Sequence, residues 1–165
     1  MILADTDILS ALAKVGRLPL LFELFQTTIH ITPSVLRELA HSLNLRRQYA
    51  EEVFSSISVG QIQVVSLTQG EAALRDILPD SLGAGERESI AVARERHGTV
   101  LSNETRVAHC CRQNQIPCVR LPDILRALWV EGVVPRQEVQ DIINDLRVKD
   151  RMQFKLSTVK AIFAD

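Results

Sequence analysis

The segment Ile2–Gly16, ILADTDILSALAKVG, indicates the fold class. Its first residues, together with Met1, form a short apolar run that is typical of a buried strand and ends at the carboxylate Asp5. The residues that follow place apolar side chains at helical spacing: Ile8, Leu9, Leu12, Ala13 and Val15. The segment therefore predicts a strand over Met1–Ala4, an acid at its end, and a helix directly after it.

The same alternation of strand and helix continues along the chain. We predict further strands in the β-prone residues before Pro33 and at Gln61–Leu67, Thr99–Leu101 and Pro117–Arg120. The predicted helices are Leu18–Phe25, one that begins at Pro33, Arg46–Ile57, Glu86–Glu95, Thr105–Arg112, Pro122–Trp129 and Pro135–Leu146. Such alternation implies a parallel sheet covered on both faces. The expected fold class is α/β, a three-layer α/β/α fold with a central parallel sheet.

Length and composition indicate one globular domain. The chain has 165 residues, of which 46% are hydrophobic and 24% charged. We expect the domain to occupy residues 1–146, followed by a basic tail over residues 147–165 that is an arm, a lid or an ordered helix. The net charge of -1 gives no argument for or against nucleic acid.

The cysteines indicate a reducing environment. Cys110, Cys111 and Cys118 are odd in number, which is a poor basis for disulfides, so we expect buried thiols. Together with His109 they suggest a zinc site. Neighbouring residues on a helix point about 100° apart, however, and no CxxC pair is present, so structural burial is favoured over zinc binding. The chain also shows no signal-peptide pattern and no apolar run of membrane-spanning length, so we expect a cytoplasmic protein.

Carboxylates follow several of the predicted strands or begin the helices after them. Asp5, Glu86 and Glu104 all have this placement. In an open parallel sheet, ligands bind outside the carboxyl ends of the strands, so these side chains are expected to converge there. Acids gathered in one cleft repel each other, and a hard cation such as Mg²⁺ or Mn²⁺ keeps them ionised together. The pattern predicts metal-assisted hydrolysis of phosphodiester bonds.

Four segments then resemble, in order, the acidic motifs of PIN domains. They are ILADTDILSALAKVG with Asp5, TPSVLREL with Glu38, LGAGERESIAVA with Glu86, and TVLSNETRVA with Glu104. The similarity covers roughly Met1–Gly132. It is greatest to the VapC-like toxin ribonucleases, a branch whose third motif contains Gly-Glu, here Gly85 and Glu86.

The resemblance implies a metal-dependent endoribonuclease, the toxin of a toxin–antitoxin pair. It implies Mg²⁺ or Mn²⁺ as cofactor, RNA as substrate, a homodimer, and a small antitoxin as partner. Asp5, Glu38, Glu86 and Glu104 would be the catalytic acids, and Asp5, Glu86 and Glu104 the metal ligands. Their polar neighbours are expected to support the metal, directly or through water: Thr6, Asp7, Ser102, Asn103 and, as a rival to Glu86, Glu88. Arg106 is expected to contact a phosphate.

Each acid also has a simpler interpretation. Asp5 and Glu104 are suited to cap the helices that follow them, as is Asn103, and Glu38 has the sequence context of a solvated helix residue. Moreover, the fourth motif of this branch usually carries Asp where this chain has Asn103 and Glu104. The longer side chain is expected to shift a bound metal and could weaken the enzyme.

Two other functions therefore stay open. The first is a catalytically silent PIN-like module that binds RNA or a protein. The second is a nucleotide-binding or receiver-like α/β domain, which is disfavoured because neither GxGxxG nor GxxxxGK[ST] occurs in the sequence.

Overall fold

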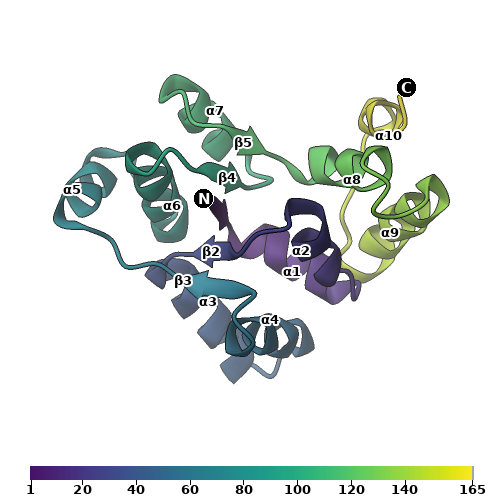
Figure 1. Ribbon diagram of the computed structural model, residues 1–165, viewed down its shortest axis with the longest axis horizontal. Helices are drawn as coiled ribbons and strands as arrows, with labels where there is room; N and C mark the ends of the chain where they lie inside the picture. The colour runs from purple at the N-terminus through teal and green to yellow at the C-terminus, as the bar shows by residue number, and fades with distance from the viewer. Residues whose placement is uncertain (165) are drawn as a thin grey trace.

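The computed structural model describes residues 1–164, and its centre is a five-stranded parallel sheet (Figure 1). The strands are β1 (Ile2–Ala4), β2 (Ile29–Ile31), β3 (Ile62–Val64), β4 (Thr99–Leu101) and β5 (Cys118–Val119). Their order across the sheet is β3-β2-β1-β4-β5, and each neighbouring pair is parallel. This architecture confirms the predicted three-layer α/β/α class.

Helices connect and cover the strands. They are α1 (Thr6–Lys14), α2 (Pro19–Phe25), α3 (Pro33–Asn44), α4 (Gln48–Ser58), α5 (Gln69–Ile77), α6 (Ala84–Glu95), α7 (Thr105–Gln113), α8 (Leu121–Val130), α9 (Arg136–Lys149) and α10 (Leu156–Ile162). Helix α5 was not predicted, and α6 begins two residues before the predicted Glu86. None of the helices within residues 1–164 has the length and hydrophobicity that a membrane span requires.

Alternation along the strands divides the core into two parts. In β1, Leu3 packs into one hydrophobic cluster, whereas Ala4 packs into the other. In β4, Val100 and Leu101 divide in the same way. Successive side chains of a strand point to opposite faces, so each face of the sheet has its own apolar layer. The layers are covered by different helices, as a three-layer fold requires.

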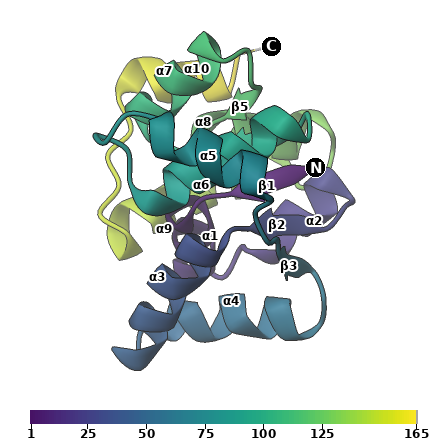
Figure 2. The ribbon, with the colours of Figure 1, turned by 90° about the vertical axis from the view of Figure 1, so that its left-hand side faces the viewer.

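The smaller cluster lies under α6 and α7, and the larger one under α1, α3, α8 and α9. Figure 2 views the molecule from the side on which α5 and α6 lie in front of the sheet. The C-terminal helix α10 packs against α8, where the Trp129 indole donates to the Ile162 carbonyl oxygen at 2.8 Å. The segment predicted as a basic arm, lid or helix thus contains an ordered helix.

The chain order creates a crevice between β1 and β4. From β1 the chain continues to β2 on one side, whereas from β4 it continues to β5 on the other. Such a reversal of direction is the point at which open α/β sheets bind ligands, outside the carboxyl ends of the strands. Asp5 follows β1 and Ser102 follows β4, so both lie at this crevice.

Candidate active site

Asp5 follows β1 at the point where the strand order reverses between β1 and β4. It is only 7% exposed, and its Oδ2 accepts a hydrogen bond from the Ser102 hydroxyl at 3.0 Å. Its Oδ1 accepts from the backbone N–H of Thr6 at 2.7 Å, because Asp5 is also the N-cap residue of α1. The capping interpretation and the site interpretation of Asp5 are therefore compatible.

Thr6 connects Asp5 to the second predicted acid. While its backbone donates to Asp5, its hydroxyl donates to Glu38 Oε2 at 2.5 Å, across 32 positions of sequence. This contact brings α3 to the beginning of α1. Glu38 thus lies beside the crevice, although its residue is exposed.

Glu86 reaches the site from the beginning of α6. Its Oε2 accepts from the backbone N–H of Gly83 at 2.6 Å, which caps its own helix. The preceding Gly85 brings α6 against α3: a Cβ placed there would lie 2.8 Å from Val35 Cγ2 and 3.5 Å from Glu38 Oε1. The Gly-Glu pair therefore places Glu86 and Glu38 on facing helices at one site.

Asp7 and Glu104 complete the acidic group. Burial, followed by the nearby charge of Glu104, raises the pKa of Asp7. Glu104 is the N-cap residue of α7, yet its carboxylate makes no capping hydrogen bond. Its backbone N–H instead donates to Ser102 Oγ at 3.3 Å. The carboxylate of Glu104 thus belongs to the acidic group through its electrostatic effect on Asp7.

Glu88, the rival of Glu86, has a different environment. Its side chain is buried and accepts from the backbone N–H of Ser34 at 2.8 Å and from the Ser34 hydroxyl at 2.7 Å. The Arg37 guanidinium lies 3.8 Å from Glu88 Oε1, the oxygen that accepts from the Ser34 hydroxyl. Glu88 therefore satisfies the N-terminus of α3 and joins α3 to α6.

The remaining predicted residues are Asn103 and Arg106. The carbonyl oxygen of Asn103 accepts from Arg120 at 3.2 Å. Arg106 donates to the Ser81 carbonyl oxygen at 2.7 Å and thus joins α7 to the loop before α6. Of the cysteines, Cys110 and Cys111 are buried as predicted, whereas Cys118 is half-buried.

A family model described as a PIN domain matches residues 1–164. The chain belongs to the PIN-domain family. PIN domains are generally nucleases that use divalent metals and bind nucleic acid. A search of curated proteins finds no match.

In this PIN domain, Asp5 is a buried carboxylate close to other acids. Burial, followed by the nearby charge of Asp7, raises the pKa of Asp5 to about 7, and Glu86 adds to the effect. The hydrogen bonds from Ser102 and Thr6 lower the pKa but do not offset this. A divalent ion would remove the cost of keeping Asp5 ionised beside other acids.

The donor set of this PIN domain fits a hard cation. The side chains around the crevice are carboxylates with hydroxyl neighbours, which are the oxygen ligands preferred by Mg²⁺. As the side chains are placed, no three Asp, Glu, His or Cys groups within residues 1–164 are close enough to hold an ion together. Glu86 and Glu38 instead accept the hydrogen bonds from Gly83 and Thr6.

The sequence interpretation missed one residue at this edge of the PIN domain. Arg120 follows β5 and reaches Asn103 beside the acidic group. The signal was present, because a residue at the end of a predicted parallel strand is expected at the same edge as Asp5.

Proposed function

We propose that this protein is a metal-dependent endoribonuclease that hydrolyses RNA phosphodiester bonds. The observation that carries the proposal is the buried Asp5 at the β1–β4 crevice, with Glu86, Asp7 and Glu104 within electrostatic range of it or of each other. Burying a carboxylate among like charges is costly unless a cation compensates it. Membership of the PIN-domain family supports nuclease chemistry at this place.

The side chains would divide the work. Asp5, Glu86 and Glu104 would hold a Mg²⁺ or Mn²⁺ ion, which when bound polarises a phosphoryl oxygen and lowers the pKa of the attacking water. Ser102 and Thr6 donate to Asp5 and fix the direction of its oxygens. Glu38, which accepts from the Thr6 hydroxyl, and Asp7 would accept a proton or orient water.

Thermal unfolding measured at increasing Mn²⁺ concentrations tests metal binding without requiring catalysis. A ligand that binds only the folded state stabilises it by about 2.7 kcal/mol at 100 times its Kd. The wild-type protein should show a saturable increase in Tm, Asp5→Asn should lose it, and Glu88→Gln should retain it. An increase that persists in Asp5→Asn would contradict the proposed ligand set.

The second candidate is a silent PIN-like module that binds RNA or a protein. Two observations favour it, the first being that within residues 1–164 no three ligating side chains are close enough to hold an ion together. Glu104 in place of the shorter Asp points in the same direction. No shift of Tm with Mn²⁺, combined with RNA binding, would favour this module over the enzyme.

We further propose, from the family resemblance, that the protein acts as a toxin in the cytoplasm, as a homodimer inhibited by a small antitoxin. The three free thiols suit a reducing compartment. Induced expression should arrest growth for the wild type and not for Asp5→Asn. Equal growth with both would contradict the toxin role, and light scattering of the purified protein would test the dimer.

A further inference from the structure

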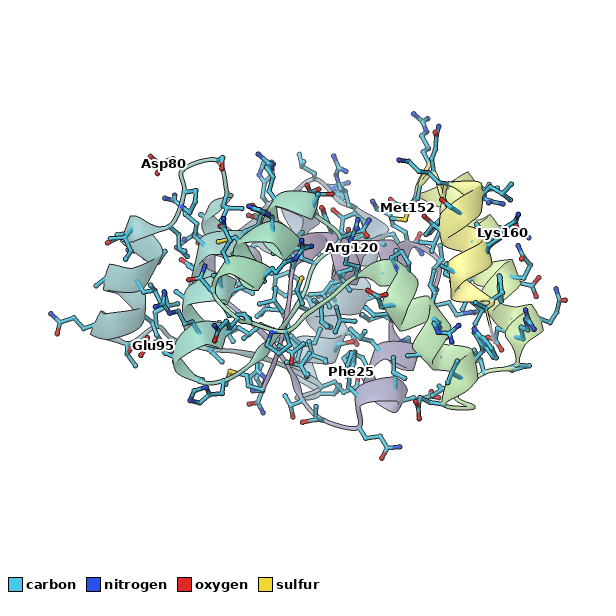
Figure 3. All side chains as sticks on the ribbon, turned by 90° about the horizontal axis from the view of Figure 1, so that it is seen from above. Phe25, Asp80, Glu95, Arg120, Met152 and Lys160 are labelled. Carbon is cyan, nitrogen blue, oxygen red and sulfur yellow. The ribbon has the colours of Figure 1, made fainter. Side chains whose placement is uncertain are left out.

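A pocket lies beside the acidic group, at the carboxyl ends of β4 and β5. Its volume is about 360 Å³, which is enough for a nucleotide-sized group. Its lining residues include Asn103, Thr105 and Arg120, together with Gln153, Lys155 and Thr158 of the C-terminal segment. Figure 3 labels Arg120 and Met152, which also lines the pocket, near each other beside α10.

The pocket is cationic. Arg120 and Lys155 are its charged lining residues, and neither makes an ion pair with any residue in the described range 1–164. Asp123 accepts from the backbone N–H of Arg120 at 3.1 Å. By contrast, Lys14 and Arg96 are paired with Asp150 and Glu71.

Arg120 is also held in place. Its guanidinium donates to the Asn103 carbonyl oxygen at 3.2 Å, and its Nε is buried without a hydrogen-bond partner in residues 1–164. A buried donor left unsatisfied costs free energy, which a ligand or water could recover. A fixed guanidinium is suited to a planar or tetrahedral oxyanion, and phosphate is the common one.

The pocket is continuous with the catalytic edge. Asn103, which accepts from Arg120, lies between two residues of the acidic site. The preceding residue, Ser102, donates to Asp5, and the following residue, Glu104, belongs to the acidic group. An RNA backbone that presents one phosphate to Asp5 would therefore bring a neighbouring phosphate toward Arg120. Phe154 and Met152 add apolar surface against which a base can pack.

We propose that this pocket binds a phosphate of single-stranded RNA next to the one cleaved, with Arg120 and Lys155 as the ligands. The proposal rests on the proposed RNA cleavage at Asp5. It gives the C-terminal segment a function: residues 152–158 form one wall of the substrate site. It also gives a chain of net charge -1 two unpaired cations, Arg120 and Lys155, along the path of an RNA backbone.

The test is binding of a fluorescent single-stranded RNA, measured by anisotropy at several salt concentrations with chelator present. The parent is Asp5→Asn, which cannot cleave and has less negative charge at the site. Arg120→Gln and Lys155→Gln are compared in this background with Lys160→Gln, an exposed cation of α10 that lies on the far side of that helix from Arg120 in Figure 3. Thermal unfolding of each variant verifies that it is folded.

Each phosphate contact to single-stranded nucleic acid contributes a slope of about 0.7 in log affinity against log salt. Losing one contact should thus reduce the change in affinity between 50 and 200 mM salt by about threefold. We expect this reduction, together with weaker binding, for Arg120→Gln and Lys155→Gln but not for Lys160→Gln. Because Lys155 is exposed, its variant should fold even if Arg120→Gln is destabilised.

Equal binding by all three variants would overturn the pocket, as would a parent that does not bind RNA at all. The outcomes separate the two proposals. If the wild type cleaves RNA but binding does not depend on Arg120 and Lys155, the proposed phosphate pocket is wrong and the proposed nuclease activity stands. Binding that depends on both residues, without metal-dependent cleavage, would leave the pocket and remove the nuclease.

Discussion

Replacing Asp5 by Asn should stabilise the metal-free protein at alkaline pH. Asparagine can still accept the hydrogen bond from Thr6, but it carries no charge into the buried site. In the wild type, burial and the neighbouring acids raise the pKa of Asp5 from 3.8 to about 7. The folded protein therefore binds a proton at Asp5 up to about pH 7, whereas the unfolded chain releases it near pH 4.

The magnitude follows from that difference. Between pH 5 and pH 7, the unfolding free energy of the wild type falls by about 1.4 kcal/mol per pH unit because of Asp5, and above pH 7 it becomes constant. The variant has no such loss. Its stability relative to the wild type should thus increase by about 3 kcal/mol from pH 5 to pH 8.

The assay is urea unfolding in chelator, followed by the fluorescence of Trp129, the single tryptophan, and by circular dichroism. Asp141→Asn, at an exposed position of α9, is the matched control: it retains Asp5, so its stability should fall with pH as that of the wild type does. A variant that is less stable than the wild type at pH 8 would refute the reasoning. It would mean that the ionised form of Asp5 is stabilised by the fold, so that no cation is needed there.

Two further changes test how α6 is joined to α3. Gly85→Ala should destabilise the protein by about 1 to 3 kcal/mol, because the new methyl group would lie 2.8 Å from Val35 Cγ2. In the control Gly83→Ala the nearest contact of the new methyl group is 3.5 Å, so Tm should change little. Equal effects of the two substitutions would contradict the close approach of α6 to α3. Glu88→Gln should cost about 1 to 3 kcal/mol in urea unfolding, since it loses one of the acceptors used by Ser34, while RNA cleavage per folded molecule stays the same. Lost cleavage in a folded Glu88→Gln would place Glu88 in the active site.

Much of the fold could be predicted because its strands are short apolar runs followed by amphipathic helices. Helix α5 was missed because it contributes little to the core: its buried residue is Glu71, Leu74 packs against the smaller cluster only in part, and Ile77 is exposed. Its sequence did contain a helix-start signal, since Thr68 and Glu71 form a capping box. The start of α6 was displaced because Glu86 occupies the third helical position, where it caps the helix through Gly83.

The candidate site could be predicted in part. The positions of Asp5 and Glu104 after strands follow from sequence, because parallel strands share one carboxyl edge. The contact of Thr6 with Glu38 spans 32 positions and depends on how α3 packs, which no local pattern specifies. Likewise, only packing distinguishes Glu86 from Glu88, which differ in burial although they are two residues apart.

The most direct test of the central claim is cleavage of a mixed single-stranded RNA by the purified protein, with Mn²⁺ and with chelator. Wild type and Glu88→Gln should cleave only with metal, whereas Asp5→Asn and Glu86→Gln should lose cleavage by at least about a hundredfold while remaining folded. Cleavage that survives in chelator or in Asp5→Asn would contradict the claim that a metal held by these acids performs the reaction.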